Sequence, residues 1–360
     1  MTLALKPLQL GHLRFDLPVV QAALSGYSDT PMRMIARRLG APYTLCEVML
    51  DYFVLQVKQR RRTHHLMHVA DEEHPVGGQL MGAQPDQFGP AARKLVERGF
   101  DVIDINFGCP VKKVVGRCRG GFHLGQPQIA LEIVERVREA VPISIPVTVK
   151  MRRGIDDSAA SREQFQEIFD GAYQRGAAAI TVHSRTVRQR YDGPSQWDFL
   201  RELKQQATGR VLLGSGDLFD APACIDMLRS TGVDGVSVAR GAIGNPWIFQ
   251  QVRSLIAGQP LPDPPGLREQ REVIATHYRL AEQLYGAKRC LPGMRKFGIK
   301  YSQLHPCHEQ VRADFCTVRQ PGAWQTVLDK WYAQDGPGVH PPVEEPNPMV
   351  RSREFELPLC

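Results

Sequence analysis

The feature of this sequence that most limits its fold is a repeated alternation of short apolar segments with segments of helical periodicity. Eight apolar segments with strand character lie near 18–24, 43–48, 75–80, 101–106, 146–151, 178–183, 210–215 and 233–239. The segments between them repeat apolar residues at helical spacing, for example Ile129, Ile133 and Val137. Strands that alternate with helices pair in parallel through right-handed crossovers. Eight such units in about 245 residues predict an α/β fold, the (β/α)8 or TIM barrel.

Local signals refine this prediction. A doubly wound sheet is the alternative fold, but no GxGxxG motif follows the first strand, which disfavours it. Residues 7–16 alternate apolar and polar about Gly11 and predict a small hairpin that covers the bottom of the barrel. Asp29 and Asp220, each followed closely by a proline, predict helix starts. Helix ends are expected at Gly40, Gly99, Gly176 and Gly232.

The alternation of strands and helices stops near residue 258. A proline-rich segment follows over 259–266, and residues 267–333 have helical character throughout. One face of the first of these helices is expected to carry Val273, His277, Leu280, Ala281 and Leu284. We therefore expect a catalytic barrel over 1–257, an all-helical domain over 258–334 and a loose C-terminal tail over 335–360.

Charge and cysteine content indicate the setting in which the chain works. Forty-five basic residues against thirty-eight acidic ones give a net charge of +7, which suits a polyanionic partner. The eight cysteines form no CxxC pair, as expected of free thiols in a reducing compartment. The first residues lack a signal-peptide pattern, and no apolar run reaches the ~18 residues of a membrane span. We expect a cytoplasmic monomer without a membrane partner.

In a barrel of this kind, the functional residues lie at the carboxyl ends of the strands. Here those ends are polar and cationic and hold few carboxylates. This disfavours a glycosidase, which needs a pair of acids, and a divalent-metal site. The most prominent of these residues is Cys109, between Gly108 and Pro110. The residues at these ends are Ala22-Ala23-Leu24-Ser25, Glu47, Gln79, Asn106, Cys109, Lys150, Arg152, His183, Arg185, Gly214-Ser215-Gly216-Asp217 and Ala239-Arg240-Gly241.

The last two of these strand ends favour a phosphate site. Gly214, Gly216 and Gly241 leave backbone N–H groups open to close approach, and Arg240 supplies positive charge. Lys150 and Gln79 come from other strands, and a cation with an amide suits a planar heterocycle that carries negative charge when reduced. The residues therefore predict flavin mononucleotide (FMN), with its phosphate over strands seven and eight.

Five motifs in register resemble those of the tRNA-dihydrouridine synthases. They lie at 79–82, 104–115, 147–152, 182–186 and 240–249, and the second contains Asp104-Ile-Asn-Phe-Gly-Cys-Pro110. The resemblance covers about residues 8–257. It extends more weakly into the helical segment, where Tyr285-Gly286 and residues 294–301 resemble the family's Arg-Lys-His motif.

This resemblance implies reduction of uridine to 5,6-dihydrouridine in the D-loop of tRNA, with FMN as cofactor and NADPH as reductant. Hydride would pass to C6, and Cys109 would give a proton to C5. A cysteine thiol, with a pKa of about 8.5, is protonated at neutral pH and can serve as this acid. Asn106 and Arg152 would face the uracil. The expected flavin-binding residues are Ala23, Leu24, Ser25, Gln79, Lys150, His183, Ser215, Gly216, Asp217, Ala239 and Arg240.

Basic residues near these motifs suit a tRNA partner. Lys112 and Lys113 directly follow the cysteine turn, and we expect them to contact phosphate. Residues 288–300 carry five basic side chains and no acid. Of these, we expect Arg295, Lys296 and Lys300 to follow the RNA backbone, with a solvated helix face as the alternative. Folded tRNA is read by shape and phosphate, and a stacked uracil must be flipped out to react.

Some positions depart from the family pattern. Ser215 replaces a usual asparagine, Ala239 a usual glycine and Phe297 a usual histidine, and the loop 116–124 carries unusually large side chains. Two alternatives therefore stay open. One is a flavin barrel that reduces a free pyrimidine, as dihydroorotate dehydrogenases do, and the basic helical segment disfavours it. The other is an RNA-binding barrel without catalysis, which the altered loop favours.

Overall fold

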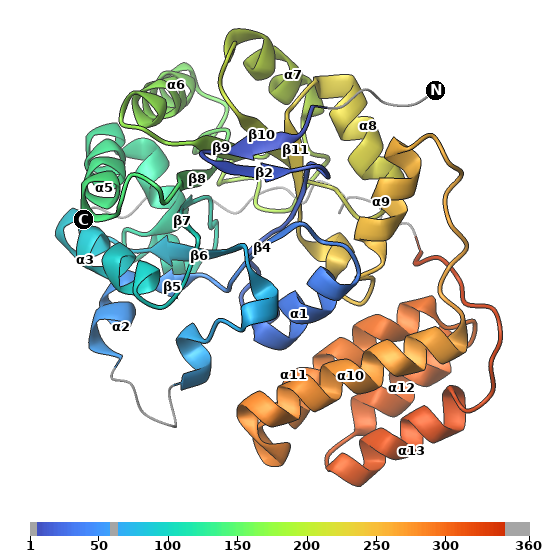
Figure 1. The fold of residues 1–360 in the computed structure, drawn as a ribbon. Helices are drawn as coiled ribbons and strands as arrows, with labels where there is room; N and C mark the ends of the chain where they lie inside the picture. Colours follow the sequence, from blue (N-terminus) through green and yellow to red (C-terminus); the bar gives the residue numbers. More distant parts are fainter. Residues whose placement is uncertain (1–5, 58–63, 343–360) are drawn as a thin grey trace.

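The computed structural model describes residues 6–57 and 64–342, and its centre is a closed barrel of eight parallel strands (Figure 1). Strand β11 pairs with β3 and β4 pairs with β6, which closes the ring. The expected (β/α)8 barrel and all eight expected strands are confirmed. In order around the ring the strands are β3 (Val19–Gln21), β4 (Tyr43–Leu45), β6 (Val76–Met81), β7 (Val102–Phe107), β8 (Val147–Arg152), β9 (Ala179–His183), β10 (Leu212–Ser215) and β11 (Gly235–Val238).

Helices connect the strands and surround the barrel (Figure 1). The expected helix starts are confirmed: Asp29 accepts a hydrogen bond from the Met32 N–H and Asp220 one from the Ala223 N–H, so each caps a helix. Gly232 ends its helix with a φ of 72°. The helices are α1 (Thr30–Arg38), α3 (Pro85–Val96), α5 (Pro127–Ala140), α6 (Ala159–Gln174), α7 (Trp197–Gln206), α8 (Ala221–Thr231) and α9 (Ile248–Ile256).

The amino end of the barrel is closed by the expected hairpin. Strands β1 (Leu8–Leu10) and β2 (Leu13–Phe15) pair antiparallel. Leu8, Leu10 and Phe15 are buried and pack with interior residues such as Val20 and Val102. The amino half of the barrel interior is therefore apolar, and polar side chains gather toward the other end.

Two connections contain elements that the sequence did not predict. Between β4 and β6 lie strand β5 (Met49–Leu50), helix α2 (Asp51–Gln56) and 3-10 turns at His64–Met67 and Asp71–Glu73. Between β7 and α5 lie helix α4 (Lys112–Val115) and a 3-10 segment, Gly120–Gly125. These elements are too short to show a hydrophobic period.

After the barrel the chain is helical, as expected. The helices are α10 (Leu267–Tyr285), α11 (Ala287–Tyr301), α12 (His308–Thr317) and α13 (Pro321–Trp331), drawn in orange to red in Figure 1. The buried face of α10 contains His277 and Ala281, as predicted, together with Gln270 and Ile274. Within the described ranges, no helix combines the length and the apolar character that a bilayer span requires.

The helical part packs on the barrel, and the start of the expected tail packs on the helical part. Helix α10 lies against α1 (Figure 1). The Leu267 N–H donates to the Gly336 carbonyl at 2.9 Å, and the Val339 N–H donates to the Leu304 carbonyl at 2.9 Å. The first residues of the expected loose tail are thus hydrogen-bonded to the helices, because their backbone groups complete helix ends. Residues 343–360 lie outside the described part.

Candidate active site

The turn that carries Cys109 follows β7 at the carboxyl end of the barrel. The Asn106 Oδ1 atom accepts hydrogen bonds from the Gly108 and Cys109 N–H groups, each at 3.0 Å. The Arg152 Nε donates to the Gly108 carbonyl at 2.9 Å. Cys109 is a half-buried free thiol. Burial raises its pKa, and a backbone N–H and the positive charge of Arg152 oppose this rise only in part. The thiol is therefore protonated at neutral pH and can donate a proton.

A row of hydrogen-bonded side chains supports this turn from inside the barrel. Gln79, Asp104 and Thr148 stand level on the neighbouring strands β6, β7 and β8. The Asp104 carboxylate accepts from the Gln79 Nε2 at 2.6 Å and from the Thr148 hydroxyl at 2.5 Å. The Asn106 Nδ2 donates to the Gln79 Oε1 at 2.8 Å. These bonds hold the side chain of Asn106, and through it the cysteine turn, in one position.

Lys150 and His183 differ in charge although they lie at the same end of the barrel. Burial lowers the pKa of Lys150 to about 8, and the carboxylate of Asp104 opposes this lowering. Burial, with the charges of Arg152 and Lys150, lowers the pKa of His183 well below its usual value. The imidazole is therefore neutral. Its Nδ1 accepts from the Arg185 N–H at 3.2 Å, so its proton is on Nε2. The site offers one cation and one neutral N–H donor.

A backbone cradle follows β10 and β11. Gly216 has a φ of 119°, and a Cβ there would lie 2.1 Å from the Ser195 Oγ, so a side chain does not fit. Asp217 accepts from Arg185 at 2.7 Å and from the Ser195 N–H at 2.7 Å. A Cβ at Gly241 would lie 2.4 Å from a backbone oxygen. The protein's own atoms therefore exclude a side chain at both positions, and the backbone of the cradle is held in this close packing.

Arg240 is the exposed cation beside this cradle. Its guanidinium lies 4.5 Å from the ring centroid of Phe219 and 5.4 Å from that of Tyr191. Its nearest contact with Asp217 is 3.9 Å. The stacked rings orient the guanidinium, which also lies within ion-pair distance of Asp217.

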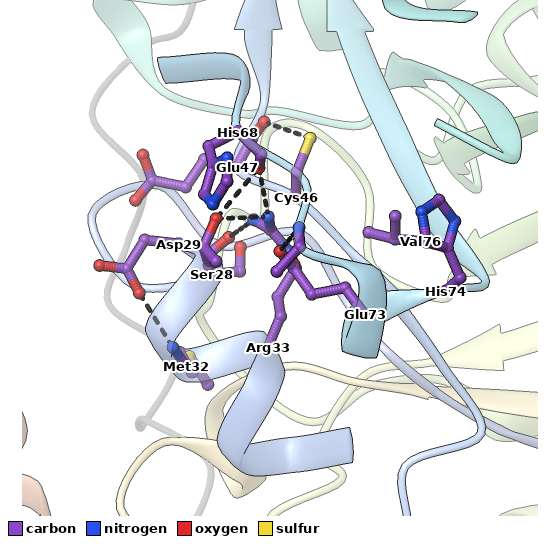
Figure 2. A network of polar contacts seen from close by, with 12 residues as sticks. Ser28, Asp29, Met32, Arg33, Cys46, Glu47, His68, Glu73, His74 and Val76 are labelled. Atoms are coloured by element: carbon purple, nitrogen blue, oxygen red, sulfur yellow. Dashed lines mark hydrogen bonds and ion pairs between the residues drawn. The ribbon is translucent and has the colours of Figure 1, made fainter. Parts of the chain in front are cut away.

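The β3–α1 loop, residues 24–29, follows the carboxyl end of β3, and Figure 2 shows the polar contacts of its Ser28 and Asp29. Arg33 lies beneath it, where it donates to the Ser28 carbonyl at 2.7 Å and forms a buried ion pair with Glu73 at 2.5 Å. Expected flavin contacts Ala23, Leu24 and Ser25 lie at the start of this loop and are partly exposed. The buried Arg33–Glu73 ion pair therefore holds the side of this loop that faces the barrel.

Comparison with known proteins agrees with this geometry. The family model described as "Dihydrouridine synthase (Dus)" matches residues 20–334, which include both the barrel and the helical part. The chain belongs to this family. The predicted family and enzyme class are therefore confirmed.

Relatives of this dihydrouridine synthase match over nearly their whole length. A "Probable tRNA-dihydrouridine synthase" of Mycobacterium tuberculosis is 32% identical over 90% of this chain and 84% of its own. A "tRNA-dihydrouridine synthase B" of Xanthomonas campestris is 31% identical over 93% of this chain and 99% of its own. A solved morphinone reductase in complex with tetrahydroNAD has a TM-score of 0.54 at 15% identity, covering 74% of this chain and 93% of its own, and it supports the fold.

The basic residues expected to contact RNA fall into different places in the synthase. Lys112 and Lys113 are exposed on α4, just beyond the cysteine turn. Arg295 is half-buried on α11, and the backbone of Lys300 lies against Gly244 of the barrel. The Lys296 ammonium donates to the Gly26 carbonyl at 2.8 Å. The structure thus gives the exposed Lys296 a partner on the barrel.

Arg152 also lies differently from its expected position facing the uracil. Its side chain is 2% exposed, and it donates to the carbonyls of Gly108, Thr186 and Arg190. Through these three bonds the guanidinium joins the cysteine turn to the loop that contains Thr186 and Arg190. The guanidinium therefore holds the cysteine turn against the loop that follows β9.

Two residues of the site, Asp104 and Arg185, were given no role from the sequence. Asp104 alternates with buried Ile103 and Ile105, a spacing that directs it into the barrel together with Asn106. That alternation was a usable signal. Arg185 is fully buried and forms an ion pair with Asp217, and no pattern in the neighbouring sequence indicates this partner.

Proposed function

We propose that the protein reduces uridine to 5,6-dihydrouridine in the D-loop of tRNA, with FMN as cofactor and NADPH as reductant. The observation that carries the proposal is the half-buried Cys109 thiol on a turn that Asn106 and Arg152 fix at the carboxyl end of the barrel, the end at which Lys150 and His183 also lie. The relatives named tRNA-dihydrouridine synthase match the barrel and the helical part together, which supports tRNA over a free pyrimidine.

The residues of the site fit a flavin mononucleotide. The cradle at Gly216 and Gly241, with Arg240 beside it, suits a phosphate, because backbone close to a ligand and a cation are what phosphate binding requires. Lys150 and Gln79 suit the polar edge of the flavin ring. When bound and reduced, the flavin supplies hydride to C6 of the uracil.

The chain itself supplies the proton and the orientation. The Cys109 Sγ gives its proton to C5, and the burial that raises its pKa keeps that proton in place at neutral pH. Asn106 and Arg152 hold the turn through its backbone, so the sulfur keeps one position. The His183 Nε2–H and the Lys150 ammonium are the donors available to the uracil and flavin oxygens.

We further propose that residues 258–334 form the tRNA-binding domain and that residues 1–257 form the FMN-binding catalytic domain. Helix α11 contacts the barrel at Gly26 and Gly244, which follow strands β3 and β11. The helical part therefore adjoins the carboxyl end of the barrel. A basic surface there would continue the exposed Lys112 and Lys113 into a groove for the RNA backbone.

The test compares Cys109→Ala with Cys307→Ala, an exposed cysteine on the helical part. Purified wild type should show a flavin absorption spectrum that bleaches with NADPH, and both variants should keep it. Dihydrouridine formed in unmodified tRNA should fall about 10²- to 10⁴-fold in Cys109→Ala alone, because a positioned acid contributes that much. Unchanged dihydrouridine formation would remove Cys109 from the mechanism, and a colourless protein that takes up no FMN would refute the proposal.

A further inference from the structure

The β3–α1 loop is held on its barrel side by hydrogen bonds from three directions. The Ser28 Oγ accepts from the Leu24 N–H at 2.7 Å, which closes the loop on itself. Arg33 donates to the Ser28 carbonyl at 2.7 Å. The Glu47 N–H donates to the same carbonyl at 3.2 Å. Figure 2 shows Ser28, Arg33 and Glu47 gathered around this loop. These contacts fix residues 24 and 28. At the tip, the Tyr27 N–H donates to the Leu24 carbonyl at 3.0 Å, and the Glu47 carboxylate accepts from the Gly26 and Tyr27 N–H groups, which leaves the Gly26 carbonyl to a partner outside the barrel.

The helical part supplies those partners. The Lys296 ammonium donates to the Gly26 carbonyl at 2.8 Å and lies 5.0 Å from the centroid of the Tyr27 ring. The ring of Phe297 meets Tyr27 edge-on at 5.4 Å between centroids. Two residues beyond Tyr27, the Asp29 Oδ2 accepts from the Tyr285 hydroxyl at 2.9 Å. The loop is therefore clamped between the barrel and helices α10 and α11.

The position of this clamp matters for the cofactor. Gly26 immediately follows Ala23-Leu24-Ser25, the segment that the sequence resemblance leads us to expect against the flavin. Gly26 has a φ of 78° and is exposed. A charge-assisted hydrogen bond from the helical part to its carbonyl adds a restraint to those that Glu47 and the turn place on this segment.

We propose that Lys296 is a positioning residue that fixes the β3–α1 loop for flavin binding, so that flavin affinity depends on the helical part. The inference rests on the proposed function and on the expectation that residues 23–25 face the flavin. The expected role of Lys296 as an RNA contact is the alternative that the experiment separates from it. Loss of the ammonium would remove the restraint that the helical part places on the loop tip, and flavin binding would then have to complete its ordering at a cost in affinity.

The experiment titrates FMN into the full chain after removal of bound flavin, with quenching of flavin fluorescence as the readout. Lys296→Met should raise the Kd for FMN about three- to tenfold, because one charge-assisted hydrogen bond is lost at an exposed site. Lys296→Arg should restore near wild-type affinity, because a guanidinium also donates to a carbonyl and stacks on a tyrosine. Lys288→Met, on the same helix and exposed, is the matched control.

Tyr285→Phe tests the same clamp through a milder change. It removes only the hydroxyl that bonds Asp29, and it should also raise the Kd for FMN. A Kd within twofold of wild type in both Lys296→Met and Tyr285→Phe would overturn the inference. So would an unchanged Kd in Lys296→Met together with a weaker salt dependence of tRNA binding, since that result would make Lys296 a phosphate contact. Failure of wild type to bind FMN would instead overturn the proposed function.

Discussion

Asp29 provides a quantitative test of how the barrel and the helical part are joined. Its carboxylate caps α1 through the Met32 N–H and accepts from the Tyr285 hydroxyl of α10. Burial raises the pKa of this carboxyl from 3.8 to about 6, although both hydrogen bonds and the charge of Arg33 oppose the rise. We consider the exchange Asp29→Asn, which keeps a good capping residue but removes the charge.

The sign of the effect follows from proton binding. Between pH 3.8 and 6 the folded state binds more protons at Asp29 than the unfolded state, so wild-type stability falls as pH rises through this window. With these two pKa values, the free energy of unfolding of wild type relative to Asp29→Asn should fall by about 2 kcal/mol between pH 4.5 and 7.5. Above pH 7 the difference should stay constant, because the carboxyl is then ionised in both states.

The measurement is urea unfolding followed by tryptophan fluorescence at pH 4.5, 6.0 and 7.5. Asp220→Asn is the matched control, because Asp220 also caps a helix that has proline in its first turn. A stability difference between wild type and Asp29→Asn that is the same at all three pH values would refute the reasoning. It would mean that burial does not destabilise the charge of Asp29.

Three further exchanges test other parts of the site. Gly216→Ala should weaken FMN uptake, because a Cβ at a φ of 119° and against Ser195 would shift the backbone of the cradle; a flavin affinity equal to wild type would contradict the cradle. Arg185→Met should cost about 3–5 kcal/mol in the free energy of unfolding, because it leaves Asp217 without its buried partner; a loss below 1 kcal/mol would show the pair to be dispensable. Arg295→Glu should weaken tRNA binding and flatten its salt dependence, and an unchanged slope in a filter-binding assay would exclude a phosphate contact.

Features with a local cause were predictable from the sequence. Short apolar runs indicate the strands. The helix caps at Asp29 and Asp220 can be recognised from a few neighbouring residues. The cysteine turn is likewise local, since Asn106 bonds residues two and three positions away. The family motifs follow the same strand ends, so the fold and the enzyme class could be read before the structure.

Features that depend on distant partners were not predictable. Lys296 bonds a residue 270 positions away, and its charge alone suited RNA equally well. Arg152 stands at a strand end, as expected, but its three carbonyl partners lie on loops whose paths no local pattern specifies. Strand β5 has only two residues, too few to carry an alternation.

The interior row of Gln79, Asp104 and Asn106 has a consequence for how this protein can change. The Asp104 carboxylate can only accept hydrogen bonds, and the Gly108 and Cys109 N–H groups can only donate them. The side-chain amides of Gln79 and Asn106 lie between these groups, so each amide has only one orientation that satisfies its neighbours. Gln79→Glu alone would set two acceptors face to face. The same exchange joined with Asp104→Asn restores a donor between them and conserves the charge. Positions 79 and 104, on different strands, are therefore coupled, and substitutions at them are tolerated as pairs.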